Sequence, residues 1–390
     1  MLRDIIIYAP MFVTLLWSLV LLTSSPKNNR AKFFLGIFMF VCFLLFLSYA
    51  FYFKKQIDTF LYFDLIFIFC ALSVFPLNYC YIKLLTVETT FRFKDLKMFL
   101  PAFIFLSISV INYLIMSPEQ RYLYVSECIF NNNWIPNADF VIKFQKSISR
   151  MIPYIYVLQI IYTYVKGRKC LKEYNKTIAN FYSNIDDKTI NWAGLILNSL
   201  VVASIISFVF SILGRHFFMH SQWILLIPSA SFSTLLFIVG YLGNIQNHTV
   251  ANLELDVVCV SDEIRDCDTI TQTNEDTNNS NKLKVEIVDL FENKQIFTNP
   301  NLKIVDLANM LKTNRTYVSS VINNDFSCTF SRFVNQYRIR KAKEIMVHDT
   351  NKKYALELIS HEVGFGSLHT FIRVFKELEG ITPGAFRDKE

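Results

Sequence analysis

The chain lacks the residue patterns that mark most enzymes and metal proteins. Its eight cysteines include no Cys-x-x-Cys pair and no cluster with histidine, so neither a zinc site nor a disulfide framework is indicated. The His-Glu-x-x-His, Gly-x-Ser-x-Gly, phosphate-loop and protein-kinase signatures are also missing. We therefore predict no enzyme activity, no catalytic or metal-binding residue and no cofactor.

Long apolar runs fill the first two thirds of the chain, and ionisable residues within them are scarce. Hydrophobic residues make up 53% of the 390, there are 38 phenylalanines, and the mean hydropathy is +0.32. A membrane-spanning helix needs about 20 mostly apolar residues. Seven runs meet this length approximately: Ile5–Leu22, Phe33–Phe53, Phe60–Leu85, Leu96–Met116, Ile148–Val165, Trp192–Leu213 and Trp223–Leu242.

The distribution of basic residues predicts the orientation of these spans. Twelve lysines and arginines fall in the loops after the first, third and fifth spans, and seven fall on the opposite side. The positive-inside rule then puts the N-terminus outside and the C-terminus in the cytoplasm, which predicts a multi-pass protein of a bacterial inner membrane. The alternative, a cleaved signal peptide ending near Ser24-Ser25, would leave six spans and an external C-terminus.

A few polar residues of the membrane part are candidates for sensing. Asp64 is the one acid in a predicted span and lies near one end of the third, so we expect it at the membrane interface rather than in a proton relay. The external loop Ser117–Ser147 holds aromatic and acidic residues that anchor the interface or line a ligand site. His216 and His220 are surface histidines or pH sensors. The residues singled out in the external loop are Tyr122, Tyr124, Glu127, Trp134 and Asp139.

Charge and composition divide the chain into three parts. Residues 1–246 carry a net charge of +10, residues 247–281 carry −7, and residues 282–390 carry +4. The middle part is rich in Asn, Thr and Asp and cannot bury enough apolar surface to fold alone. We predict an all-α protein with a membrane domain over 1–246, a flexible acidic linker over 247–281 and a soluble domain over 282–390.

The soluble part reads as seven short helices with two helix-turn-helix units. Ile304–Leu311, the polar turn Lys312–Asn314 and Arg315–Asn323 form the first unit. Tyr354–Val363, the turn Gly364–Ser367 and Leu368–Leu378 form the second. A long helix, Thr329–Val347, joins them, Lys284–Asn293 precedes them, and a short helical turn ends at Arg387. The polar face of the long helix carries five basic residues, Arg332, Arg338, Arg340, Lys341 and Lys343. This face either binds DNA or is only exposed to solvent.

The run from Gly364 to Arg387 resembles the signature of the AraC/XylS family of transcription regulators. The resembling positions include Gly364-Phe365, Phe371, Arg373-Val374-Phe375-Lys376 and Gly380-Ile381-Thr382-Pro383, with support from Ile304–Ala308 and the long helix. The resemblance covers about residues 283–388. Two positions depart from the pattern: Ser360 replaces a usual alanine, and Gly366 replaces a common serine, which would loosen the second turn.

The resemblance implies that two reading helices enter adjacent major grooves on one face of double-stranded DNA. Arg315 is then suited to read base edges, unless it pairs with Asp306 or Asp325, and Arg373 and Lys376 are suited to grip phosphates. Phe365, Phe371, Val374 and Phe375 are expected in the core. The predicted DNA-binding residues are Asn314, Arg315, Thr316, Tyr317, Ser319, Ser320, Asn323, Ser367, Leu368, His369, Thr370, Arg373 and Lys376.

Three functions fit this organisation. The first is a membrane-embedded, sequence-specific transcription regulator, with double-stranded DNA, the lipid bilayer, RNA polymerase, a second copy of the chain and an unidentified signal ligand as partners. The second is a transporter or membrane enzyme with a regulatory DNA-binding tail, which the scarcity of ionisable residues in the spans disfavours. The third is a DNA-binding domain with a passive anchor, for which a single span would suffice.

Overall fold

The chain folds into helices. In the computed structural model the described residues are 2–24, 29–87, 93–186, 188, 191–213, 222–246, 276–349 and 354–389, and no β-strand occurs among them. They divide into two compact units: Met1–Leu171 with Asn191–Ala251, and Lys172–Ile190 with Asn252–Glu390. The predicted all-α class is confirmed for these residues.

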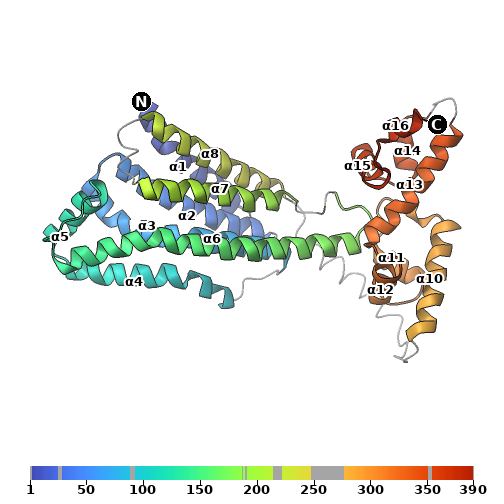
Figure 1. Ribbon diagram of the computed structural model, residues 1–390, viewed down its shortest axis with the longest axis horizontal. Coiled ribbons are helices and arrows are strands. Elements are labelled where there is room, and N and C mark those ends of the chain that lie inside the picture. The colour runs from blue at the N-terminus through green and yellow to red at the C-terminus, as the bar shows by residue number, and fades with distance from the viewer. Residues whose placement is uncertain are drawn as a thin grey trace. The chain divides into compact units, whose positions relative to one another are not determined.

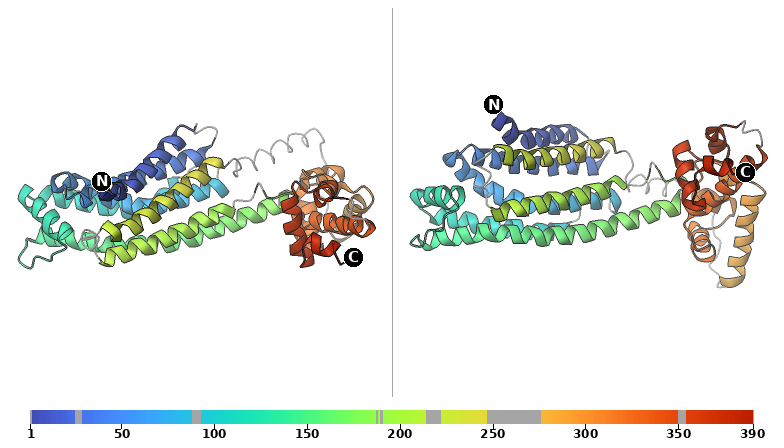
Figure 2. Two further views of the ribbon diagram at one scale, coloured as in Figure 1. Left: turned by 90° about the horizontal axis from the view of Figure 1, so that it is seen from above. Right: turned by 45° about the horizontal axis from the view of Figure 1, so that its top comes forward.

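The first unit is a bundle of long helices that run side by side (Figures 1 and 2). Six of the seven predicted spans each lie within one of them, and the fourth, Leu96–Met116, begins in the 3-10 turn before its helix. The helices are α1 (Leu2–Leu22), α2 (Arg30–Phe53), α3 (Ile57–Thr86), α4 (Leu100–Ile115, after a 3-10 turn at Phe93–Phe99), the short α5 (Pro118–Leu123), α6 (Phe140–Phe181), α7 (Asn191–Leu213) and α8 (Gln222–Ile245). The last part of α6, from Lys172, belongs to the second unit.

Among the described residues, five helices are long and apolar enough to cross a membrane. They contain the first four predicted spans and the seventh. The predicted fifth span lies within α6 and the sixth within α7, which are not among the five. The count of seven spans therefore stays a prediction.

Glycines on α8 let the neighbouring helices approach closely. α1 packs against both α2 and α8. A Cβ on Gly240 would overlap the Trp17 ring of α1, and a Cβ on Gly243 would overlap Leu35 of α2. Small residues at such crossings are typical of membrane bundles, because close backbones gain van der Waals contact where lipid provides no hydrophobic drive.

One expectation for this unit was wrong, and another stays a prediction. Asp64 is 2% exposed, and the Tyr113 hydroxyl donates to its Oδ2 at 2.7 Å, so a polar partner compensates its burial. Its position at the membrane interface stays a prediction. The segment Ser117–Ser147 is not an open loop. It forms α5, a π-helix at Tyr124–Phe130 and the start of α6, and Tyr124 is fully buried, with its hydroxyl 2.6 Å from the Ser149 hydroxyl. His216 and His220 lie outside the described residues.

The second unit contains the seven predicted helices. These are α10 (Asp276–Glu292), α11 (Ile304–Met310), α12 (Arg315–Asp325), α13 (Phe330–His348), α14 (Leu356–Glu362), α15 (Leu368–Glu379) and α16 (Pro383–Arg387), with a 3-10 turn at Ile296–Thr298. Five of them begin within two residues of the predicted start, and α16 ends at Arg387 as predicted. α10 begins eight residues earlier, so the end of the predicted linker is helical. Residues 247–275 of that linker lie outside the described residues.

The long helix α13 belongs to two cores. Toward the first helix-turn-helix it buries Phe333, whose ring centroid lies 4.9 Å from that of Phe291 on α10. Toward the second it buries Ile339 and Met346 against a cluster from α14 and α15. Phe365, Phe371, Val374 and Phe375 belong to this cluster and are at most 5% exposed, which confirms that they are core residues.

Gly364 makes the turn of the second helix-turn-helix possible. Its φ is +92°, in the left-handed region that residues with a Cβ avoid. A Cβ there would also lie 2.5 Å from the carbonyl oxygen of Thr298 and 2.6 Å from that of Phe297. The turn therefore packs directly on the backbone of the 3-10 turn that precedes α11, and α15 is fixed against the rest of the unit.

Candidate nucleic-acid interface

The first predicted reading helix, α12, has one buried and one polar face. Val318, Val321 and Ile322 are buried. The Asn314 side chain caps the helix by accepting from the Thr316 amide at 2.9 Å, which satisfies one of its unpaired N–H groups. Of the predicted residues, Asn314, Arg315, Thr316, Tyr317 and Ser320 are exposed, and Ser319 and Asn323 are half-buried.

The second predicted reading helix, α15, is capped at both ends. The Ser367 hydroxyl accepts from the Thr370 amide at 3.2 Å, and Gly380 ends the helix with a φ of +77°. Phe371 and Phe375 point into the core, as does the half-buried Leu368, which therefore offers less surface than expected. The predicted residues left exposed are Ser367, His369, Arg373 and Lys376.

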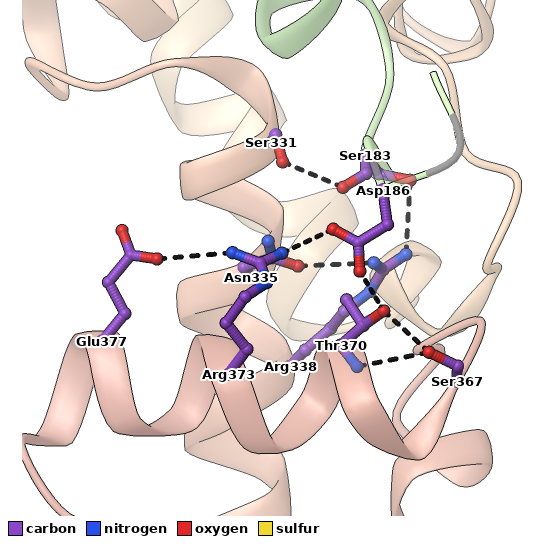
Figure 3. A network of polar contacts seen from close by, with 9 residues as sticks. All are labelled: Ser183, Asp186, Ser331, Asn335, Arg338, Ser367, Thr370, Arg373 and Glu377. Atoms are coloured by element: carbon purple, nitrogen blue, oxygen red, sulfur yellow. Dashed lines mark hydrogen bonds and ion pairs between the residues drawn. The ribbon is translucent and has the colours of Figure 1, made fainter. Parts of the chain in front are cut away.

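Thr370 is buried rather than open. It is 6% exposed, and its hydroxyl contacts both the Ser367 hydroxyl at 2.8 Å and the carboxylate of Asp186 (Figure 3). Asp186 also accepts from Arg373, with 2.6 Å between Nη2 and Oδ1. Glu377, one turn along α15, lies 3.7 Å from the other guanidinium nitrogen. Two carboxylates therefore pair with Arg373.

Three basic residues of α13 form hydrogen bonds or ion pairs within the domain. Arg338 was expected on the polar face, but it is 1% exposed and donates to the carbonyl oxygens of Phe297 and Asn299, both at 2.8 Å. Its burial lowers the pKa of the guanidinium to about 9. Arg340 pairs with Glu292 at 3.4 Å, and Lys343 pairs with Glu379 at 2.7 Å.

The two departures from the expected pattern have different surroundings. Ser360 is fully buried, and its hydroxyl donates to the carbonyl oxygen of Glu357 at 2.7 Å, so the extra polar atom is satisfied within α14. Gly366 lies against the side chain of Asn184, and a Cβ on Gly366 would overlap the Asn184 amide nitrogen. The absence of a side chain at 366 thus admits the segment that follows α6.

Comparison with known proteins agrees with this architecture. Residues 307–389 match the family described as "Helix-turn-helix domain". This part of the chain is a helix-turn-helix domain of the AraC type. Its relatives include the uncharacterized HTH-type transcriptional regulator YtdP of Bacillus subtilis (strain 168), which is 33% identical over 89 residues. The Msm operon regulatory protein of Streptococcus mutans is 26% identical over 113 residues.

Each match covers less than a third of this chain. The match to YtdP covers 23% of this chain and 11% of YtdP, and the match to the Msm operon regulatory protein covers 29% and 39%. Among solved structures, the C-terminal domain of AraT, a response regulator from Geobacillus stearothermophilus, aligns with 28% of this chain and 84% of its own. That alignment has 21% identity and a TM-score of 0.24.

Proposed function

We propose that this chain is a membrane-embedded, sequence-specific DNA-binding transcription regulator that couples a signal at the membrane to gene expression. One observation carries the proposal: a single chain contains both a helix-turn-helix domain and five helices that are apolar enough to span a membrane. The two reading helices of that domain are capped and face solvent. The DNA-binding residues we propose are the exposed residues of α12 and α15 named above, with Thr370 accessible only when Asp186 leaves it.

The contacts of residues 181–186 support seven spans rather than five. These residues pack on the helix-turn-helix domain, so both must lie on one side of the membrane. If neither α6 nor α7 crossed the membrane, four spans would precede this segment and five would precede the C-terminus. The segment and the helix-turn-helix domain would then lie on opposite sides of the membrane. With α6 and α7 both crossing, the counts are five and seven, and both lie in the cytoplasm.

A cavity of about 250 Å³ inside the bundle supports a sensory role over passive anchoring. Its lining comes mostly from apolar side chains of six α-helices and the π-helix. Asp64 is the only aspartate, glutamate, lysine, arginine or histidine among the described residues that line it. A volume near the lower limit for ligand sites suits a small, largely apolar molecule. An anchor would need neither this cavity nor more than one span.

Immunoprecipitation of crosslinked DNA from cells that express the full-length protein tests the proposed function. The test variant, Arg373→Ala/Lys376→Ala, removes two cations of α15. The charge-matched control, Arg340→Ala/Lys341→Ala, removes two cations of α13. We expect discrete peaks with a shared two-part motif that only the α15 variant loses, because phosphate contacts carry much of the affinity. Absence of peaks with intact protein in the membrane would contradict the proposal.

A further inference from the structure

The segment that follows α6 is built into the surface of the helix-turn-helix domain. Phe181, Tyr182 and Ser183 are at most 3% exposed. Tyr182 forms an isolated antiparallel bridge with Lys303, and the Ser183 amide donates to the carbonyl oxygen of Leu302 at 3.0 Å. The chain therefore pairs with the backbone just before α11.

Ser183 also contacts the long helix that joins the two helix-turn-helix units. The Ser331 hydroxyl donates to the Ser183 carbonyl oxygen at 3.0 Å, and Arg338 Nη2 lies 3.3 Å from the Ser183 hydroxyl oxygen (Figure 3). Arg338 is a buried cation, and each acceptor it gains offsets part of its desolvation. The segment thus contacts α13 both in its first turn, at Ser331, and near its middle, at Arg338.

Asp186 then reaches the proposed reading face of α15. One carboxylate oxygen accepts from Arg373 and the other from Thr370, which lie about one turn apart on the helix. A DNA phosphate would offer the same pair of donors two anionic oxygens. Asp186 therefore occupies the position that a phosphate needs when α15 enters a groove.

The same segment contacts the other reading helix. The guanidinium of Arg315, the first residue of α12, lies 5.7 Å from the centroid of the Phe181 ring, within the range of a cation–π contact. One short stretch of chain, residues 181–186, thus contacts a cation of each reading helix.

We propose that residues 181–186 are an autoinhibitory segment, in which Asp186 and Phe181 hold Arg373, Thr370 and Arg315 away from DNA. The inference rests on the proposed function. The segment begins at Phe181, the last residue of α6, and α6 contains the predicted fifth span. A signal that shifts this span would withdraw Asp186 and release the reading helices, so the segment links the membrane to DNA binding without any change in the linker before α10.

The inference can be tested by measuring how tightly the full-length protein, in lipid vesicles, binds a fluorescent DNA duplex. A duplex of mixed sequence is sufficient, because phosphate contacts are independent of sequence. Asp186→Asn breaks the ion pair with Arg373. Glu377→Gln is the matched control, because it also removes a carboxylate partner of Arg373 but leaves the segment docked. We expect Asp186→Asn to bind DNA about three- to tenfold more tightly than wild type, and Glu377→Gln to differ from wild type less than about twofold.

A crosslink separates failure of this inference from failure of the proposed function. In Asn184→Cys/Gly366→Cys the two side chains adjoin, so oxidation should join their peptides, detected by mass spectrometry, and lower DNA affinity until the disulfide is reduced. Equal affinity of Asp186→Asn and wild type, with Arg373→Ala binding more weakly, would overturn autoinhibition alone. Lack of the crosslink would also overturn it. Lack of DNA binding by every variant, with the crosslink formed, would overturn the proposed function and the inference with it.

Discussion

The Arg338 guanidinium donates from Nε to the Phe297 carbonyl oxygen at 2.8 Å and, through Nη2, to the Asn299 carbonyl oxygen at 2.8 Å. This pairing ties α13 to the turn that precedes the first helix-turn-helix. Because Arg338 is buried, its removal takes one hydrogen-bond donor from each of the two carbonyl oxygens and opens a cavity.

We expect Arg338→Leu to lower the free energy of unfolding of the second unit by about 2–4 kcal/mol. Hydrogen exchange of the α13 amides, followed by mass spectrometry in the full-length protein, would measure the loss. Arg340→Leu is the control, since Arg340 is an exposed residue paired with Glu292 and should cost less than about 1 kcal/mol. Equal exchange in both variants would show that the buried contacts carry no stability.

The N-terminal cap of α15 is a second local test. Ser367→Ala removes the acceptor for the Thr370 amide and should destabilise the helix by about 1 kcal/mol, whereas Ser367→Asn keeps a capping side chain and should cost far less. Exchange rates of the first-turn amides of α15 would report both changes. Indistinguishable rates for the two variants would contradict the capping role.

Inside the bundle, the Tyr113 hydroxyl donates a hydrogen bond to the buried Asp64 carboxylate. We expect Tyr113→Phe to lower the thermal unfolding temperature of the protein in detergent, because the buried Asp64 carboxylate loses a hydrogen-bond donor. A double-mutant cycle with Asp64→Asn should give a coupling of about 0.5–2 kcal/mol. Strict additivity of the two substitutions would show that the hydrogen bond contributes nothing.

The topology predicts different sides for the two ends of α6. In intact cells, a membrane-impermeant maleimide should label Asn137→Cys, an exposed position before α6, and should label Lys176→Cys, an exposed position near its end, only after permeabilisation. Wild-type protein gives the background from the native cysteines. Labelling of both positions in intact cells would contradict a membrane crossing by α6.

The sequence was informative wherever local signals decide the structure. Ser367 before an amphipathic run and Gly364 at a turn mark helix ends by capping and backbone geometry, and α15 begins at the predicted residue. Arg338 was misplaced because its acceptors come from Phe297 and Asn299, which helical periodicity cannot bring to it. The partner of Thr370 was missed for the same reason.

Asp186 had no signal of its own in the sequence. It stands in a polar loop 187 residues before Arg373, and an acid in a loop is most often only solvated. Gly366 was predicted to loosen a turn. The structure gives it a different surrounding, the close approach of Asn184, which depends on how the segment after α6 packs on the helix-turn-helix domain. Long-range packing of this kind is outside the reach of motif and periodicity arguments.

The most direct test of DNA binding by this chain is the salt dependence of its affinity for duplex DNA, measured on the full-length protein in vesicles. Asp186→Asn provides the open form, and the same protein with Arg373→Ala and Lys376→Ala added provides the comparison. Each phosphate contact adds about 0.9 to the slope of log affinity against log salt, so we predict a slope smaller by about two in the latter. Equal slopes, or no measurable binding by the open form, would contradict the account.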